Sequence, residues 1–427
     1  MRAFVAVAAV LAAFLSSAAA STQAVGRSPL RTWLKSCTVA AGLAAGLAVS
    51  PHVALADRPL NAPTAAGTRV NSDAESLLRY GLPINVKEIR DVQASVENIK
   101  GNLRTRRVNF AQGDASSAQR QLESNRDKIL KQVPASRRAA AEAQYAKMLE
   151  DLDPLLKAIN LESNAGSGSL QQRDALDGAY NMQDKLAKDL SAFEELLVPE
   201  GFKRDIPEEY SNLPALQGRA EVEMVFTRPS GEKFNVDGKN YDQVKISMVV
   251  DGYNAPLTGG NFVDLVNKGF YNKRVVTRSD GFVVQTGDSN PGAEGEGVLH
   301  GFVPSGATEE RIIPLELSFK GDKDLVFGST SEEEGRGAAA ATLPFQSYGA
   351  LGMARGEFEP NSASSQFFWL LFESDLTPAG KNLLDGRYTC FGYTVDGADL
   401  LKAVREGDVI STAKVTKGAE NLVPPKA

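Results

Sequence analysis

Three short segments in the C-terminal half of the chain gather the residues best suited to chemistry. They occupy residues 278–288 (RSDGFVVQTGD), 364–369 (SSQFFW) and 383–392 (LLDGRYTCFG). Each places apolar and aromatic side chains beside an amide or a guanidinium, which is unusual for surface loops. Amides and guanidiniums donate hydrogen bonds, and apolar side chains exclude water. These segments could therefore bind a ligand and stabilise it by hydrogen bonding, without a nucleophile.

The scarce residue types argue against the commoner kinds of active site. The chain has two His and two Cys, and Cys37 and His52 fall in an N-terminal stretch that we expect to be removed. The remaining Cys390 has no partner for an internal disulfide, and with His300 alone it makes no Cys/His zinc site. A Ser-His-Asp relay would depend wholly on His300. We therefore expect no metal, no cofactor and no redox or triad chemistry.

The charge of the chain is acidic and unevenly distributed. Lys and Arg number 47 against 53 Asp and Glu, a net charge of −6. Residues 1–56 contain four basic residues and no acidic one, so the remainder is more acidic still. Such a surface repels nucleic acid and anionic lipid. We expect neither nucleic-acid binding nor stable membrane insertion.

The first 56 residues have the pattern of a targeting leader. An apolar run at 3–15, followed by small residues, predicts a secretory signal, and the acid-free 21–37 is typical of a transit peptide. A second apolar run at 38–50 leads to an A-x-A cleavage signal at 54–56, and it is too short to span a bilayer. The alternative is a single secretory signal followed by a linker, which would make the protein secreted.

Residues 71–200 have a helical pattern. They hold six Gly and four Pro, whereas residues 215–427 hold 27 Gly. Apolar side chains recur every three or four residues, which predicts amphipathic helices. The stripes lie at 86–103, 122–133, 145–159 and 176–197. Four such helices with short connections predict an antiparallel bundle over 71–200, followed by a linker at 201–214.

From residue 215 onward, apolar residues recur at every second position instead of every third or fourth. The segments 220–226 (AEVEMVF) and 244–250 (VKISMVV) alternate as half-buried strands do. Between them and the later strands, Thr258 is placed to cap a short helix that Gly269 would end. Strands bounded by glycines dominate to about residue 412. We predict a closed or nearly closed β-barrel over 215–425, within a multidomain chain of α + β class.

The segments of this second half resemble the signature segments of cyclophilins. Their usual forms are F-H-R-x-x-x-x-F-x-x-Q-G-G-D, S-x-x-S-Q-F-F and W-L-D-G-x-H-x-x-F-G, and the chain adds NAPLTGGNF at 254–262 and MAR at 353–355. The leader, the helical region and this terminal region together resemble the large thylakoid-lumen cyclophilins of plants and algae. The resemblance implies the chloroplast thylakoid lumen as the location, reached through a secretory signal in an alga with a complex plastid.

The resemblance implies a peptidyl-prolyl cis-trans isomerase. Rotation about a peptide bond is opposed by a barrier of roughly 18–20 kcal/mol, because the nitrogen lone pair is delocalised. A donor aimed at the prolyl nitrogen and a dry socket for the ring would stabilise the twisted state, with no cofactor. The implied partners are proline-containing loops or unfolded chains, including photosystem II subunits during assembly and repair.

The family pattern assigns roles to eleven residues of this sequence. Arg278 would donate to the prolyl nitrogen, and Gln285 and Gln366 would hydrogen-bond the substrate backbone. The implied catalytic residues are Arg278, Phe282 and Gln285. The implied substrate-binding residues are Val283, Ala354, Arg355, Gln366, Phe368, Leu383, Leu384 and Tyr388. Ala354 and Arg355 would pair with the peptide as an edge strand, and the proline socket would be lined by Phe282, Val283, Phe368 and Leu384.

The sequence departs from the family pattern at the site. Arg278 lies four residues before Phe282 rather than five, and a slip of one residue would turn its side chain to the opposite face of the strand unless a bulge intervened. Leu383 and Tyr388 replace the usual Trp and His, and an acidic insert at 331–344 is expected to crowd the entrance. We therefore predict a weak isomerase. The alternative is a non-catalytic proline-binding scaffold or chaperone whose helical domain gates the barrel.

Overall fold

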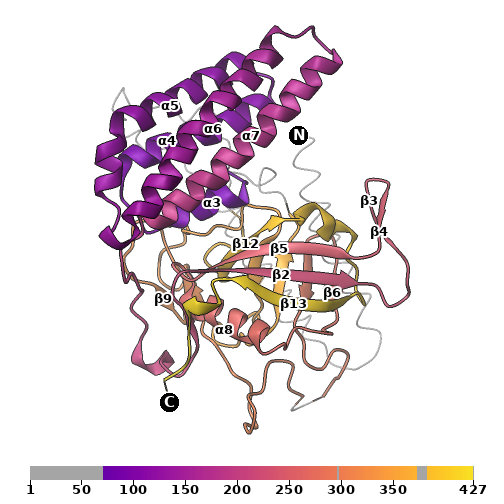
Figure 1. Ribbon diagram of the computed structural model, residues 1–427. Coiled ribbons are helices and arrows are strands. Elements are labelled where there is room, and N and C mark those ends of the chain that lie inside the picture. Colours follow the sequence, from indigo (N-terminus) through magenta and orange to yellow (C-terminus); the bar gives the residue numbers. More distant parts are fainter. Residues whose placement is uncertain (1–70, 296–297, 373–381, 427) are drawn as a thin grey trace, which may run out of the picture. The chain divides into compact units, whose positions relative to one another are not determined.

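The computed structural model describes residues 71–295, 298–372 and 382–426, so the predicted leader at 1–56 lies outside the described residues. The described chain is helical up to residue 196 and consists mainly of strands from residue 215 onward (Figure 1). This order of elements confirms the predicted α + β class.

The helical region is built around one apolar core. Its helices are α3 (Ala74–Gly81), α4 (Lys87–Arg104), α5 (Val108–Lys131), α6 (Arg138–Asn164) and α7 (Leu170–Leu196). The four long helices coincide with the four predicted apolar stripes, and they bury those stripes against one another. Tyr145 of α6 and Phe193 of α7 meet edge to face with ring centroids 5.3 Å apart. Burying each such large side chain contributes about 1.5–3 kcal/mol.

Helix α3 was absent from the predicted elements. Its eight residues are too few to repeat an apolar period, although Asp73 caps the helix by accepting from the Ser76 amide at 2.9 Å. Its two leucines do not join the bundle core. Leu77 and Leu78 lie instead in an apolar cluster with residues of the sheet, including Phe368. Helix α3 therefore packs its apolar face on the strand-rich region.

The strand-rich region is one curled antiparallel sheet with small additional pairs. The sheet order is β13-β2-β5-β12-β10-β11-β7-β6. Its strands are β2 (Arg219–Thr227), β5 (Val244–Asp251), β6 (Arg278–Ser279), β7 (Val283–Thr286), β10 (Ala350–Met353), β11 (Phe367–Leu370), β12 (Cys390–Asp396) and β13 (Val409–Lys417). The additional pairs join β1 (Ala215–Leu216) with β14 (Leu422–Val423), β3 (Phe234–Val236) with β4 (Lys239–Tyr241), and β8 (Glu316–Leu317) with β9 (Val326–Phe327). Along β2 every second side chain is buried, as the period of two predicts.

The sheet differs from the expected closed barrel at its two edges. Strands β6 and β13 end the sheet order, and β6 has only two residues, too few to form a continuous ladder with β13. The segment before β6 approaches β13 at the bridge between Val275 and Val409, and four backbone hydrogen bonds join residues 273–276 to residues 407–410. The fold is therefore a half-barrel whose two edges meet over this short segment.

Helix α8 (Pro256–Asn267) packs its apolar face against the sheet core. The predicted cap by Thr258 is wrong, because the helix begins two residues earlier and Thr258 lies within its first turn. The cap comes from Glu316 of β8, whose two carboxylate oxygens accept from the amides of Leu257 and Thr258 at 3.0 and 2.8 Å. Burial raises the pKa of Glu316 to about 7, although the two amides act to lower it.

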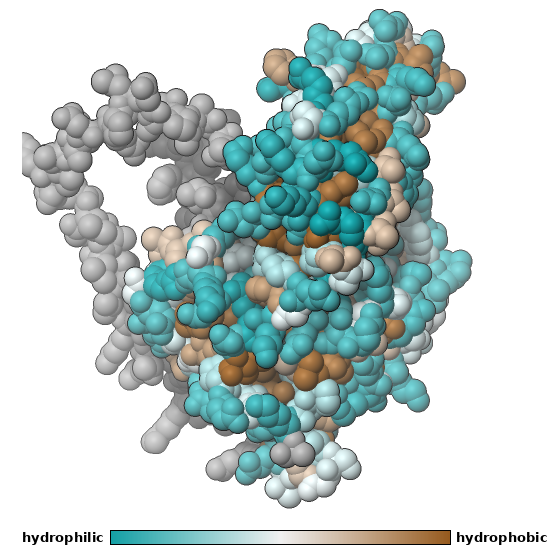
Figure 2. All heavy atoms as spheres, turned by 60° about the vertical axis from the view of Figure 1, so that its left-hand side comes forward, coloured by the Kyte–Doolittle hydropathy of each residue, from teal (hydrophilic) through white to brown (hydrophobic). Residues whose placement is uncertain are grey.

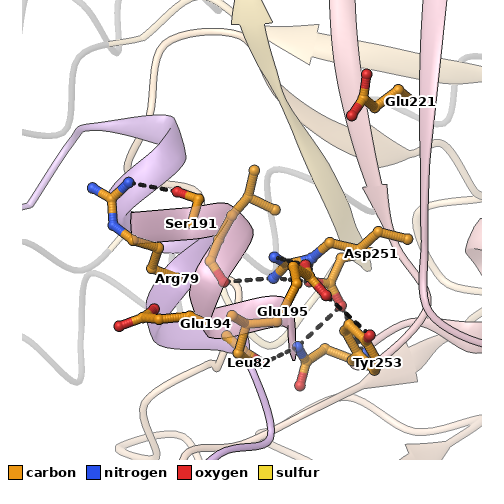
Figure 3. A network of polar contacts seen from close by, with 12 residues as sticks. Arg79, Leu82, Ser191, Glu194, Glu195, Glu221, Asp251 and Tyr253 are labelled. Carbon is orange, nitrogen blue, oxygen red and sulfur yellow. Dashed lines mark hydrogen bonds and ion pairs between the residues drawn. The ribbon is translucent and has the colours of Figure 1, made fainter. Parts of the chain in front are cut away.

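A polar network connects the helices to the sheet through Arg219 of β2. Its members Glu195, Asp251 and Tyr253 are drawn in Figure 3. The Arg219 guanidinium donates to Glu195 of α7 at 2.6 Å, to the backbone oxygen of Leu78 in α3, and to Asp251 of β5 at 2.9 Å. The Tyr253 hydroxyl also donates to Glu195, at 3.0 Å. One largely buried cation therefore joins two helices to strands β2 and β5.

Polar side chains cover most of the face that Figure 2 presents, and apolar side chains form small, separate patches on it. Within the described residues, none of the helices combines the length and hydropathy that crossing a membrane requires.

Candidate functional site

The strand register aligns four residues in a row across the sheet. Arg278 of β6 lies opposite Gln285 of β7, Gln285 lies opposite Phe368 of β11, and Phe368 lies opposite Gly352 of β10. Directly opposed residues of an antiparallel pair project from the same face. The row therefore puts a guanidinium, an amide and an aromatic ring side by side on one face, next to a position without a side chain.

The spacing of Arg278 and Phe282, which would turn Arg278 to the opposite face if the shortening fell within a strand, is accommodated in the turn before β7. Gly281 adopts a φ of +81°, which glycine tolerates without strain. The Asp280 carboxylate accepts from the amides of Phe282 and Val283, both at 3.0 Å. This tight turn takes up the missing residue, and the strand register keeps Arg278 opposite Gln285.

The guanidinium of Arg278 is held at the edge of the row by Asp280. Its Nε donates to the Asp280 carboxylate at 2.7 Å, and 46% of the arginine side chain is exposed. Burial alone would raise the pKa of Asp280, but the amides of Val283 and Phe282 and the charge of Arg278 together lower it. The carboxylate therefore stays ionised and orients the guanidinium.

Gln285 of the row and the neighbouring Gln366 line a cavity of about 280 Å³. The Gln285 side-chain amide donates to the Gln366 side-chain oxygen at 3.0 Å. A glutamine amide has two donors and an acceptor, so both side chains retain groups that can bond to a peptide backbone. Ala354 and Arg355 border the same cavity, and the Ala354 amide donates to the Gln366 backbone oxygen at 3.0 Å.

An apolar cluster lies next to this cavity and includes Val283, Phe368, Leu384 and Tyr388. Phe368 is 6% exposed, and the edge of its ring meets the Tyr388 ring at a centroid distance of 5.9 Å. A Cβ at Gly352 would come within 2.2 Å of the Phe368 ring. The ring therefore lies in space that only a glycine leaves open.

Two of the apolar side chains expected at the site lie outside this cluster. Phe282 is partly exposed and stacks on Phe372 at a centroid distance of 6.2 Å. Leu383 is 79% exposed. The structure thus brings four of the expected apolar side chains together and leaves Phe282 and Leu383 at the periphery.

Arg355, which borders the cavity, bonds to the backbone of two loop segments. Its guanidinium donates to the backbone oxygen of Arg387 at 2.9 and 2.7 Å and to that of Gly356 at 2.7 Å. It also lies over the Tyr388 ring, 4.8 Å from the centroid, in a cation–π contact. Arg355 therefore fixes the loop that carries Leu384 and Tyr388.

The acidic insert contacts the same loop. The Ser331 amide donates to the Gly386 backbone oxygen at 2.8 Å, and Glu332 pairs with Arg387 at 3.0 Å. Directly after the insert, the Phe345 ring stacks on Phe368. Sequence reasoning missed Phe345, which lies outside the recognised segments, and the role of Asp280, which stands at a variable position of the segment 278–288. For Phe345 the available signal was an aromatic residue directly after the insert.

Two family profiles match separate parts of the chain. The profile described as cyclophilin type peptidyl-prolyl cis-trans isomerase/CLD matches residues 235–420. The profile described as peptidyl-prolyl cis-trans isomerase CYP38-like, PsbQ-like domain, matches residues 73–198. The first covers the row and the cavity, and the second covers the helices.

Curated relatives match over most of the chain. The chloroplastic peptidyl-prolyl cis-trans isomerase CYP38 of Arabidopsis thaliana is 38% identical over 92% of this chain and 87% of its own length. A putative thylakoid lumen peptidyl-prolyl cis-trans isomerase of Synechocystis is 39% identical over 86% and 89%. A solved cyclophilin of Cryptosporidium parvum, crystallised with the dipeptide Ala-Pro, covers 45% of this chain and 99% of that chain at 19% identity, with a TM-score of 0.28. The chain therefore belongs to the cyclophilin-type peptidyl-prolyl cis-trans isomerase family, among its thylakoid-lumen members with an N-terminal PsbQ-like domain.

Proposed function

We propose that the row and the adjoining apolar cluster bind proline-containing segments and catalyse rotation about the X–Pro bond. The observation that carries this proposal is the register that sets Arg278 opposite Gln285 and Gln285 opposite Phe368. As the X–Pro bond twists, the prolyl nitrogen regains its lone pair, and an N–H of Arg278 donates to it. This bond forms only in the twisted state, so it lowers the barrier rather than merely tightening binding.

The other site residues hold the substrate in place. Gln285 and Gln366 bond to the peptide backbone over the cavity they line, and Ala354 and Arg355 present a strand edge beside it. Val283, Phe368, Leu384 and Tyr388 receive the proline ring, while Phe282 and Leu383 contact flanking residues of the client from the periphery. Because the apolar cluster excludes water, the ring is bound without a charged contact.

The test is a measurement of cis/trans exchange on a proline peptide by NMR, without a coupled protease. We expect Arg278→Ala to lower turnover on the order of a hundredfold, as loss of one transition-state donor does elsewhere. Arg126→Ala is the matched control, since that arginine is 51% exposed and paired with Asp127 on α5. Equal turnover in Arg278→Ala and in the control would contradict the proposal that Arg278 donates to the prolyl nitrogen.

We infer that the clients include proline-bearing lumenal loops of photosystem II subunits. The support is the PsbQ-like profile over the helices and the lumenal location stated for the Synechocystis relative. Peptides copied from such loops should bind and exchange faster in the presence of the protein, and versions with Ala in place of Pro should bind more weakly. Equal binding of both versions would contradict recognition of proline.

A non-catalytic scaffold gated by the helical domain is the second candidate. It is favoured by one observation, the packing of Leu77 and Leu78 of α3 in the same apolar cluster as Phe368. The exchange experiment separates the two candidates. Chemical-shift changes of the peptide without faster exchange would identify a proline-binding scaffold, whereas faster exchange identifies an enzyme.

A further inference from the structure

Phe345 is a buried aromatic residue outside the segments that define the family pattern. It follows the acidic insert and has no exposed surface. Its ring stacks on Phe368 with centroids 6.0 Å apart and planes inclined by 16°. The two rings lie almost parallel, so the plane of Phe345 fixes the plane in which Phe368 can pack.

The backbone of Phe345 is tied to the loop that carries two other side chains of the cluster. Its amide donates to the Asp385 carboxylate at 2.7 Å, and its carbonyl accepts from the Asn382 side chain at 3.0 Å. The Asn382 side-chain oxygen in turn accepts from the Leu384 amide at 3.0 Å. Phe345 is therefore bonded, through one intermediate residue, to the backbone of Leu384.

The Phe368 ring is confined from more than one side. Gly352 provides the space beneath it, and Tyr388 meets its edge at 5.9 Å. Phe345 is the contact that lies flat against the ring, and its own position is set by buried hydrogen bonds rather than by packing alone. A side chain that packs in one orientation is what a preorganised binding surface requires.

We propose that Phe345 is a positioning residue for the proline socket. Its ring sets the orientation of Phe368, and its backbone sets the loop of Leu384 and Tyr388. This inference deepens the proposed function and rests on it, since the socket has a role only where proline binds. Phe345 does not touch the substrate; it acts through the side chains that do.

The test compares Phe345→Leu with Phe226→Leu in the full chain. Phe226 is also fully buried and contacts Trp369 edge to face at 5.6 Å, in the core on the opposite face of the sheet. The two substitutions remove the same atoms from buried aromatic pairs, so similar losses of stability are expected. Affinity for the tetrapeptide Ala-Ala-Pro-Phe should fall about threefold to tenfold more in Phe345→Leu. Equal affinities of the two variants would overturn the inference.

A second measurement does not depend on peptide binding. In protein labelled with ¹³C in its phenylalanine rings, the Phe368 signals should shift in Phe345→Leu and stay in place in Phe226→Leu. Unchanged Phe368 signals in both would overturn the inference even if the wild type binds proline. If the wild type binds no proline peptide, the proposed function fails while these signals still test the positioning of the ring. Phe345→Met serves the same comparison if Phe345→Leu does not fold.

Discussion

At the scale of single residues, Gly352 determines how deeply Phe368 can lie in the sheet face. An alanine Cβ would meet the ring at 2.2–2.7 Å, and the ring would have to move outward. We expect Gly352→Ala to destabilise the fold by about 1–3 kcal/mol through overpacking. The displaced ring should also weaken binding of a proline peptide by about tenfold, measured by NMR titration.

Gly101→Ala is the control for this substitution. Gly101 lies inside α4 with no atom within 4 Å of the added Cβ, and alanine favours the helix by about 0.5–1 kcal/mol. Affinity should be unchanged there. A Gly352→Ala variant that binds as tightly as Gly101→Ala would show that the depth of Phe368 is irrelevant to binding.

Glu194 gives the stability of the protein a pH dependence. Its side chain is fully buried in α7, 3.4 Å from Arg90. Burial raises its pKa to about 8 from an ordinary 4.5, although Arg90 and Arg79 act to lower it. Because the native carboxyl keeps its proton where the unfolded one has lost it, the free energy of unfolding should fall as pH rises from about 4.5 to 8.

Glu194→Gln removes this titration. Between pH 5 and 8 the stability of the wild type should fall relative to Glu194→Gln by an amount on the order of a few kcal/mol, followed by urea unfolding. Glu316, whose raised pKa acts in the same direction, is present in both proteins, so its contribution cancels in the comparison. Parallel stability curves for the two proteins would contradict the assignment.

At the scale of elements, the spacing of apolar residues predicted the long amphipathic helices. Helices α4 to α7 fall on the predicted stripes, because each repeats its apolar spacing over several turns. Helix α3 was not predicted, because its eight residues are too few to repeat an apolar spacing. Its apolar face is buried against residues that are distant in the sequence. The cap of α8 was misassigned for a similar reason: Glu316 comes from another strand, and no local pattern reveals a carboxylate nearly sixty residues away.

The junction between helices and sheet depends on Arg219. Its partner Asp251 is fully buried, so removing the guanidinium leaves a buried carboxylate without its cation. We expect Arg219→Ala to lower the free energy of unfolding by about 3–5 kcal/mol, measured by denaturant titration. The side chain of Glu195 is 31% exposed, so Glu195→Ala should cost about 1 kcal/mol. Similar small losses in both variants would mean that the network adds little to stability.

At the scale of the whole molecule, the site could be predicted only as a set of residues. The family pattern named Gln285, Gln366 and Phe368, which the fold brings onto one face. It could not place Phe282 and Leu383 at the periphery, because their orientation depends on a short turn and an exposed loop. It also left the face of Arg278 open, since a sequence does not reveal whether a missing residue falls in a strand or in a turn.

Removal of residues 57–200 tests whether the helical region affects the site. The shortened chain loses Leu77 and Leu78 from the cluster that contains Phe368. We expect its affinity for a proline peptide to differ from that of the chain beginning at residue 57, because a neighbour of the socket is gone. Thermal unfolding of both chains ensures that folded proteins are compared. Equal affinity in two folded proteins would dismiss gating by the helical domain.

The seam of the half-barrel has a consequence for local unfolding. Strand β6 is two residues long and ends the sheet order, while the segment before it, residues 273–276, is joined to residues 407–410 by four backbone hydrogen bonds. Beyond these bonds β6 itself pairs with β7 over only two residues, so its local opening free energy is a small part of the global value. Gln285 and Phe368 lie on the interior strands β7 and β11. We therefore expect the amide protons of β7 and β11, which carry substrate-binding groups, to exchange more slowly than those of β6, which carries Arg278.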